Sequence, residues 1–91
     1  MYLHLGQGVV VGVKTVVGIF DLDKTTVSKH TKDFLYRAEK EGHVVNVSHE
    51  LPKSFAVCVS DRRSTVYISQ ISASTLKKRC RGAIDFGEPD A

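Results

Sequence analysis

Clustered lysines and arginines are the side chains in this sequence whose type and spacing best suit a chemical role. The densest group is Lys77-Lys78-Arg79-x-Arg81, Arg62-Arg63 forms a pair, and Lys14 and Lys53 stand singly before predicted strands. Such cations contact phosphates, which positions a protein on nucleic acid without reading its sequence. For residues 77–81 the alternative is a solvated helix face, because cations are favoured near helix C-termini. The sequence holds no zinc finger, recognition helix or base-stacking motif.

Two carboxylates follow an apolar segment in Ile19-Phe20-Asp21-Leu22-Asp23-Lys24-Thr25. This D-x-D-x-T run is similar to the first motif of the haloacid dehalogenase phosphatases. The resemblance implies Asp21 as a nucleophile toward phosphorus and Asp23 as an acid and base that helps to hold magnesium. It ends at Thr25, because no adjacent acidic pair follows for the metal and that fold needs a larger parallel sheet. The alternative is structural: Asp21 ends a strand and Asp23 begins a helix.

Glycine, histidine and cysteine patterns predict neither a cofactor nor a metal. Gly8 to Thr15 has three residues between its glycines where a phosphate loop has four, and a strand follows it, so its glycines are typical of turns. The histidines are scattered, without the spacing of converging metal ligands; they are His4, His30, His43 and His49. Cys58 and Cys80 are expected to be reduced, with Cys58 in the core where burial raises the pKa of its thiol. We therefore predict no catalytic residue.

These candidates must be positioned by a fold whose first third is rich in strands. Glycine turns separate apolar segments that predict strands at residues 2–5, 9–11 and 16–20. The period then changes, since Val27, Phe34, Leu35 and Ala38 share one helical face. This spacing predicts a helix over residues 26–41 that ends at a left-handed Gly42. Its capping candidates are Asp23, Thr25 and Thr26.

The second half of the chain repeats this succession of strands and a helix. Strands are predicted at residues 44–47, 54–59 and 65–69. Residues 60–64 join the last two strands as a hairpin. Ser72 or Ser74 caps a last helix that ends near Arg81, with Leu76 and Cys80 facing inward. The predicted order is β-β-β-α-β-β-β-α, an α+β domain at residues 1–81, followed by an acidic tail at residues 82–91 that we expect to be disordered.

Both faces of the predicted sheet are apolar, which bears on assembly. In the strand at residues 54–59, Phe55, Val57 and Val59 point one way, and Ala56 and Cys58 point the other. One long helix cannot cover every such face in a chain of 91 residues. We infer that an apolar face or edge is buried against another copy, which predicts a homo-oligomer.

Length, composition and charge set the broad class. With 91 residues, 42% hydrophobic and 25% charged, the chain fits one soluble domain. No segment is long enough to span a membrane and no secretory signal is evident, so we expect a cytoplasmic protein without membrane association. The net charge is +3, although Asp85, Glu88 and Asp90 make the end of the chain acidic. A basic body favours polyanionic partners, although such a charge also fits simple solubility.

Four segments together resemble the RemA/RemB family of small bacterial regulators. They are Tyr2-Leu3-His4-Leu5-Gly6-x-Gly8-Val9-Val10-Val11, Ile19-Phe20-Asp21-Leu22-Asp23-Lys24-Thr25, Pro52-Lys53-Ser54-Phe55 and Val66-Tyr67-Ile68-Ser69-x-Ile71-Ser72. The resemblance covers residues 1–81. It implies a cytoplasmic regulator of Gram-positive bacteria linked to extracellular matrix and biofilm genes, and a chain that is not an enzyme.

The RemA branch of this family implies a DNA-binding assembly. Its subunits look like LytTR-type DNA-binding domains and close into rings whose basic outer surface wraps DNA. The resemblance thus implies a ring-shaped homo-oligomer larger than a dimer, with double-stranded DNA as its partner and no small-molecule ligand. A ring repeats each weak phosphate contact and gains affinity through avidity. Such binding is architectural more than base-specific.

The resemblance also points to contact residues. The RemA branch places arginines in the loop before the third strand and before the first strand of the last hairpin. Lys14-Thr15 and Pro52-Lys53 stand there in this sequence, and lysine lacks the bidentate geometry of arginine. We therefore predict Lys14 and Lys53 as the first DNA-binding residues, and Arg62 and Arg63 as the second.

Three functions remain open. The first is the ring-shaped DNA-binding regulator, and the second is an oligomeric scaffold that binds protein and leaves DNA alone. The third is a magnesium-dependent phosphatase whose activity would vanish in Asp21→Asn; we expect no such activity. The acidic tail has the sign needed to shield the basic surface, in which case truncation after Arg81 would raise DNA affinity.

Overall fold

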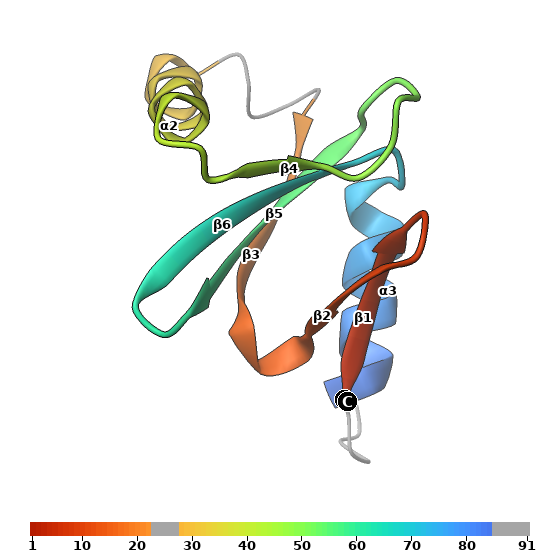
Figure 1. Ribbon diagram of the computed structural model, residues 1–91. Helices are drawn as coiled ribbons and strands as arrows, with labels where there is room; N and C mark the ends of the chain where they lie inside the picture. Colours follow the sequence, from red (N-terminus) through yellow and green to blue (C-terminus); the bar gives the residue numbers. More distant parts are fainter. Residues whose placement is uncertain (23–27, 85–91) are drawn as a thin grey trace.

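The computed structural model describes residues 1–22 and 28–84 of the chain (Figure 1). These residues form a small α+β domain, as predicted, made mostly of strands with two longer helices. In chain order the elements are β1 (Tyr2–Gly6), β2 (Val9–Gly12), the short 3-10 helix η1 (Val13–Thr15), β3 (Val16–Asp21), α2 (Lys29–Lys40), β4 (Val44–Asn46), β5 (Ser54–Ser60), β6 (Arg63–Ser69) and α3 (Ala73–Ile84).

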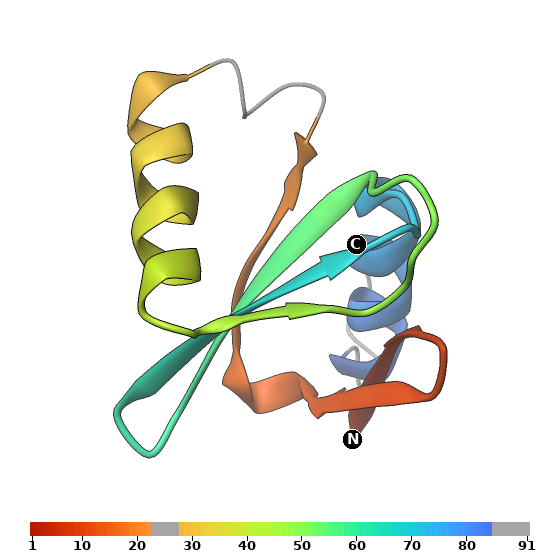
Figure 2. The same ribbon diagram turned by 45° about the horizontal axis from the view of Figure 1, so that its top comes forward.

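The strands form two sheets. Four of them lie side by side in the order β3-β5-β6-β4, with β5 antiparallel to both of its neighbours and β4 parallel to β6. β1 and β2 form a separate antiparallel pair that continues through η1 into β3. Figures 1 and 2 show α2 on one face of the four-stranded sheet, and the β1–β2 pair with α3 on the other. The domain is therefore three layers deep.

Each face of the four-stranded sheet has its own core. On one side, residues of β1, β2, η1, β3, β5 and α3 pack together, and Leu3, Leu5 and Leu76 are almost fully buried there. On the other side, Ala38 of α2 packs against Phe55 and Val66. Within α2, Phe34 is 42% exposed although its spacing predicts an inward position. Val27 lies outside the described residues.

The alternation along β5 corrects the argument for assembly. Ala56 and Cys58 enter the core under α3, and Phe55 and Val57 enter the core under α2, as the two-sided pattern indicates. The chain itself covers both faces, however, because the β1–β2 pair adds a layer that the helix count left out. These faces need no second copy to cover them, and the assembly stays a prediction that must rest on other surfaces.

The helix ends follow local capping chemistry. Ser28 is the N-cap of α2 and its Oγ accepts from the Thr31 N–H, so α2 begins at Lys29 and not at residue 26. The capping candidates Asp23, Thr25 and Thr26 lie outside the described residues. Gly42 has a φ of +77° just after α2, which is the left-handed conformation expected of it.

The last helix begins where predicted and extends further. The Oγ of Ser72 accepts from the Thr75 N–H at 3.2 Å, so Ser72 is the cap. Leu76 is fully buried and Cys80 is half-buried, both on the inward face as predicted. α3 continues to Ile84, so residues 82–84 are helical although the sequence places them in the tail. Residues 85–91 lie outside the described residues.

Two buried serines at the end of the sheet form hydrogen bonds with β1 and with the segment just before α3. Ser69 Oγ donates to the Leu5 carbonyl at 2.8 Å and accepts from the Ile71 N–H at 3.0 Å. Ser54, its neighbour across the β5–β6 ladder, donates to the Ile71 carbonyl at 2.7 Å. Both serines are at most 1% exposed. Removal of either hydroxyl leaves a buried backbone group without its partner.

We expect Ser69→Ala to destabilise the domain by about 1–3 kcal/mol, the cost of buried polar groups that lose their hydrogen bonds. A lower urea midpoint with an unchanged slope would show it. The matched control is Ser64→Ala, since Ser64 lies in the same strand and is exposed, and should change stability by less than about 0.5 kcal/mol. Equal losses in the two variants would contradict this role for Ser69.

Candidate nucleic-acid interface

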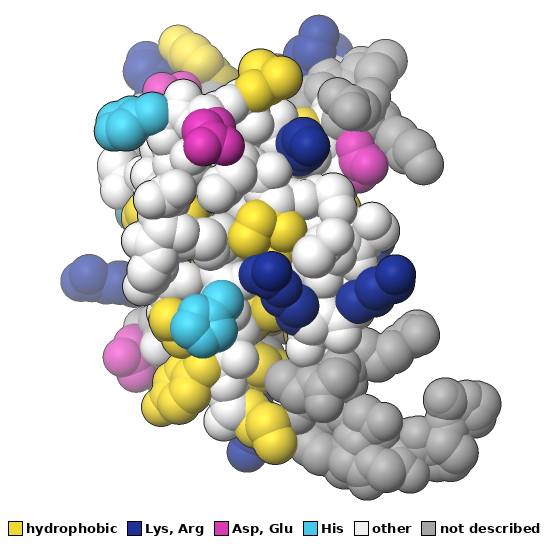
Figure 3. Space-filling model, turned by 90° about the vertical axis from the view of Figure 1, so that its right-hand side faces the viewer, with side chains coloured by type: hydrophobic (Ala, Val, Ile, Leu, Met, Phe, Trp, Pro, Cys, Tyr) yellow, Lys and Arg dark blue, Asp and Glu magenta, His cyan; other side chains and the backbone are white. Residues whose placement is uncertain are grey.

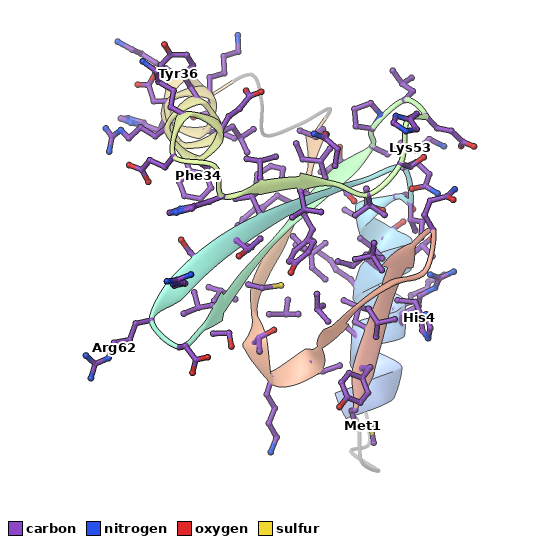
Figure 4. All side chains as sticks on the ribbon, in the orientation of Figure 1. Met1, His4, Phe34, Tyr36, Lys53 and Arg62 are labelled. Carbon is purple, nitrogen blue, oxygen red and sulfur yellow. The ribbon has the colours of Figure 1, made fainter. Side chains whose placement is uncertain are left out.

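Arg62 and Arg63 lie at the tip of the β5–β6 hairpin. The ladder pairs Ser60 with Arg63, so the turn consists of Asp61 and Arg62 alone and not of residues 60–64 as predicted. Both turn residues have a left-handed φ, +53° and +66°, as in a type I′ turn. A side chain other than glycine costs about 1 kcal/mol in that conformation. Figure 4 shows the Arg62 side chain extending away from the fold.

Lys14 lies at the same end of the sheet as this tip. It is exposed on η1, which is held by the bond from the Val13 N–H to the Met1 carbonyl and by the Thr15 hydroxyl on the Gly12 carbonyl. Because β3 and β5 are antiparallel, the start of β3 meets the end of β5, where Val16 pairs with Cys58. This pairing brings η1 and the hairpin tip to one end of the molecule (Figure 1).

Lys53 lies at the opposite end. It immediately precedes β5, and its backbone bonds to Ser69 and Leu22 where β6 and β3 finish. The seven residues of β5 separate it from the hairpin by about 20 Å, at about 3.3 Å a residue. Figure 4 shows Lys53 and Arg62 at opposite ends of the sheet. The structure therefore brings Lys14 toward the hairpin arginines and does not bring Lys53 to them.

All four predicted cations are exposed and available to an anion. Within residues 1–22 and 28–84, none of Lys14, Lys53, Arg62 or Arg63 has a carboxylate within ion-pair distance. An exposed cation without a partner keeps its hydration until a phosphate approaches, so these side chains provide charge without bidentate geometry fixed in advance. Their arrangement suits several separate phosphate contacts and not one anion pocket.

Further cations lie beside this end, among them residues 77–81, which the sequence already singles out as its densest basic group. Residues 1–20 and 62–84 contain no Asp or Glu; their cations are Lys14, Arg62, Arg63, Lys77, Lys78, Arg79 and Arg81. η1 contacts α3, so the short helix that carries Lys14 lies beside the helix that carries Lys77, Lys78 and Arg79. Figure 3 shows Lys and Arg side chains beside hydrophobic ones on this side. We call the surface of Lys14, Lys77, Lys78 and Arg79 the basic side.

Arg79 of the basic side forms a hydrogen bond with the N-terminal strand pair. Its Nη1 donates to the His4 carbonyl at 3.3 Å, and α3 packs against β1. Segregation of charge along the chain was the sequence signal for this surface, since each of the two segments lacks carboxylates throughout. The sequence alone does not show that these two segments, which are far apart in the chain, lie side by side in the fold.

The surroundings of Asp21 differ from those that a phosphatase motif implies. Asp21 ends β3, which is the edge strand of a mixed sheet and is antiparallel to β5. The phosphatase resemblance implies a larger parallel sheet. Asp23 lies outside the described residues. In the part of the chain that the structure describes, no three His, Cys, Asp or Glu side chains are grouped closely enough to hold a metal ion.

The cysteines belong to the core. Burial raises the pKa of the Cys58 thiol, while a hydrogen bond with Thr15 lowers it and the nearby Cys80 raises it further. A thiol with a raised pKa is a poor nucleophile at neutral pH. Cys58 is therefore a packing residue, as predicted.

Comparison with known proteins gives two findings. The family model described as RemA-like, extracellular matrix regulatory protein A-like, matches residues 2–80. Extracellular matrix regulatory protein B of Bacillus subtilis (strain 168) is 42% identical to this chain over 82 residues, which cover 89% of this chain and 91% of that protein. Among the described residues, no helix is long and apolar enough to cross a membrane.

Proposed function

The chain belongs to the RemA-like family of extracellular matrix regulatory proteins, and from that premise we propose that it regulates matrix and biofilm genes as a ring-shaped homo-oligomer that binds double-stranded DNA. The observation that carries the DNA partner is a set of exposed cations that have no carboxylate partner among residues 1–22 and 28–84: Lys14, Lys53, Arg62 and Arg63. Their role is to neutralise phosphates, which supplies affinity without base reading. The family is named for regulation and not for an enzymatic reaction.

The spacing of these cations favours a long polyanion over a small anion. Lys53 and the hairpin tip are about 20 Å apart, which corresponds to about six base pairs at the 3.4 Å rise of one DNA strand. One subunit would make a few separate contacts, each of them weak and screened by salt. An assembly that presents the same contacts from successive subunits to one DNA molecule adds them through effective concentration.

An exposed edge of the sheet supports self-association. Among the described strands, β3 is the first in the order β3-β5-β6-β4, so β5 is its neighbour within that sheet and the other edge faces outward. Its ladder with β5 is irregular between Val16 and Gly18, and Val17 in between is 68% exposed. Phe20 of the same strand is 38% exposed. An open edge with exposed apolar residues is a typical place for another chain to bind.

A protein-binding scaffold is the second candidate. It is favoured by exposed apolar residues such as Tyr36 on α2 at 61% and Leu51 at 80%. Exposed aromatic side chains anchor many protein interfaces. This candidate shares the assembly with the first and differs in the absence of DNA binding.

Light scattering of the purified protein, with and without a DNA fragment, tests the proposal. We expect a discrete assembly larger than a dimer that takes up DNA at about 50 mM salt and loses it by about 300 mM, since phosphate contacts weaken steeply with salt. The same assembly without DNA uptake at any salt concentration would favour the scaffold. A monomer that ignores DNA would contradict both candidates.

A further inference from the structure

The segment that follows α3 is acidic, whereas the basic side carries positive charge. Residues 85–91 read Asp85-Phe86-Gly87-Glu88-Pro89-Asp90-Ala91, with three carboxylates, one aromatic ring and no cation. They continue directly from Ile84, the last residue of α3. The basic side, by contrast, belongs to two segments without a single carboxylate. An acidic segment thus follows directly after a helix that carries several cations.

The surface beside the end of α3 also offers apolar contacts. α3 packs against β1, and Figures 1 and 2 both show its last turn next to the start of β1, where Figure 4 labels Met1. Met1 and Tyr2 are each 71% exposed there. Phe86 is the aromatic residue of the acidic segment. The surface therefore matches the segment both in charge and in apolar character.

The acidic segment is long enough to reach this surface. Seven extended residues span up to about 24 Å, at about 3.4 Å each. Lys77 lies seven residues before Ile84 in α3, which is about 10 Å along the helix axis. Lys14 is on η1, which packs against the same helix. Gly87 and Pro89 are residue types that favour the chain reversal such a return needs.

We propose that residues 85–91 dock on the basic side of their own chain and compete there with nucleic-acid phosphates. The carboxylates pair with Lys14, Lys77 and Lys78, and Phe86 covers Met1 and Tyr2. Exposed ion pairs are individually weak, so the docked segment depends on several contacts at once and on low salt. The docking stands without the proposed function; only the competition with DNA rests on it.

Labelling of individual lysines with an amine-reactive ester, quantified by mass spectrometry, tests the docking without DNA. The variant is the triple substitution Asp85→Asn, Glu88→Gln and Asp90→Asn, which keeps the length of the chain and the end of α3. We expect it to raise the labelling rates of Lys14, Lys77 and Lys78 by about 2- to 5-fold at about 20 mM salt, with no difference at about 500 mM, where exposed charges are screened.

The α2 lysines provide a matched control within the same molecule. Lys29, Lys32 and Lys40 are exposed on the far side of the sheet from α3 and should label equally in both proteins. A uniform change at all lysines, or no change at any, would overturn the docking. A truncation after Ile84 should act like the triple variant, whereas truncation after Arg81 would also shorten α3.

A second measurement separates this inference from the proposed function. If both the docking and the DNA-binding function hold, the triple variant binds DNA about 3- to 10-fold more tightly at low salt, because it has lost a competing intramolecular anion. Faster labelling of the three lysines without DNA binding by either protein would support the docking and contradict the DNA-binding function. Unchanged labelling together with protection of these lysines by DNA would overturn the docking and make the basic side a nucleic-acid surface.

Discussion

Loss of Lys14 and Arg62 together is expected to lower the DNA affinity of the assembled protein by about 100-fold at about 100 mM salt, because every subunit on the DNA loses two phosphate contacts. The loss should be the same for unrelated DNA sequences, and the salt dependence should become shallower. Fluorescence anisotropy of a labelled duplex, titrated at several salt concentrations, measures both effects for the variant Lys14→Gln/Arg62→Gly.

The turn geometry makes Arg62→Gly a clean way to remove this charge. Arg62 has a φ of +66°, which glycine adopts freely, so the variant should raise the free energy of unfolding by about 0.5–1 kcal/mol. Weaker DNA binding would then not come from a damaged fold. The matched control is Lys29→Gln/Lys32→Gln on α2, with the same loss of charge. An equal loss of affinity in the control would contradict a specific role for the Lys14 end.

Leu76→Ala is expected to cost about 2–5 kcal/mol of stability, the range for a buried leucine that leaves a cavity. Leu76 is fully buried, and its core joins α3 to β1, β2, β3 and β5. The free energy of unfolding of a small domain is only about 5–15 kcal/mol in total, so the variant should lose much of its resistance to urea. Denaturant unfolding followed by circular dichroism measures the change.

A leucine on the surface provides the comparison for Leu76. Leu51 is 80% exposed between β4 and β5, and Leu51→Ala removes the same atoms without leaving a cavity. We expect its effect on the free energy of unfolding to stay within about 0.5 kcal/mol. Similar losses in both variants would mean that α3 does not close the core.

Local patterns predicted most elements, because strands and helices follow from short-range periodicity. The alternation in β5 correctly predicts that Phe55 and Ala56 face opposite sides of the sheet. The tight turn was missed because Asp61-Arg62 lacks the usual Asn-Gly or Asp-Gly pair. The end of α3 was missed because Gly82, a common helix terminator, lies inside the helix.

The candidate site was predicted in its residues but not in its arrangement. Residue types and the family resemblance selected Lys14, Lys53 and the hairpin arginines. The approach of Lys14 to the hairpin follows from the antiparallel pairing of β3 with β5, which no short stretch of sequence encodes. The basic side depends on the packing of η1 against α3, a contact between residues far apart in the chain. Such contacts are decided by the whole core and not by a pattern within it.

The joining of the first and last elements in one core also has a consequence for synthesis on the ribosome. Leu3 and Leu5 pack in the same cluster as Leu76, and the bond from Ser69 to Leu5 closes a separation of 64 residues. At about 5–20 residues per second, the N-terminal strand pair waits about 4–14 s for the helix that covers it. Nascent chains therefore expose this apolar face until α3 has been synthesised, and folding should be cooperative rather than progressive.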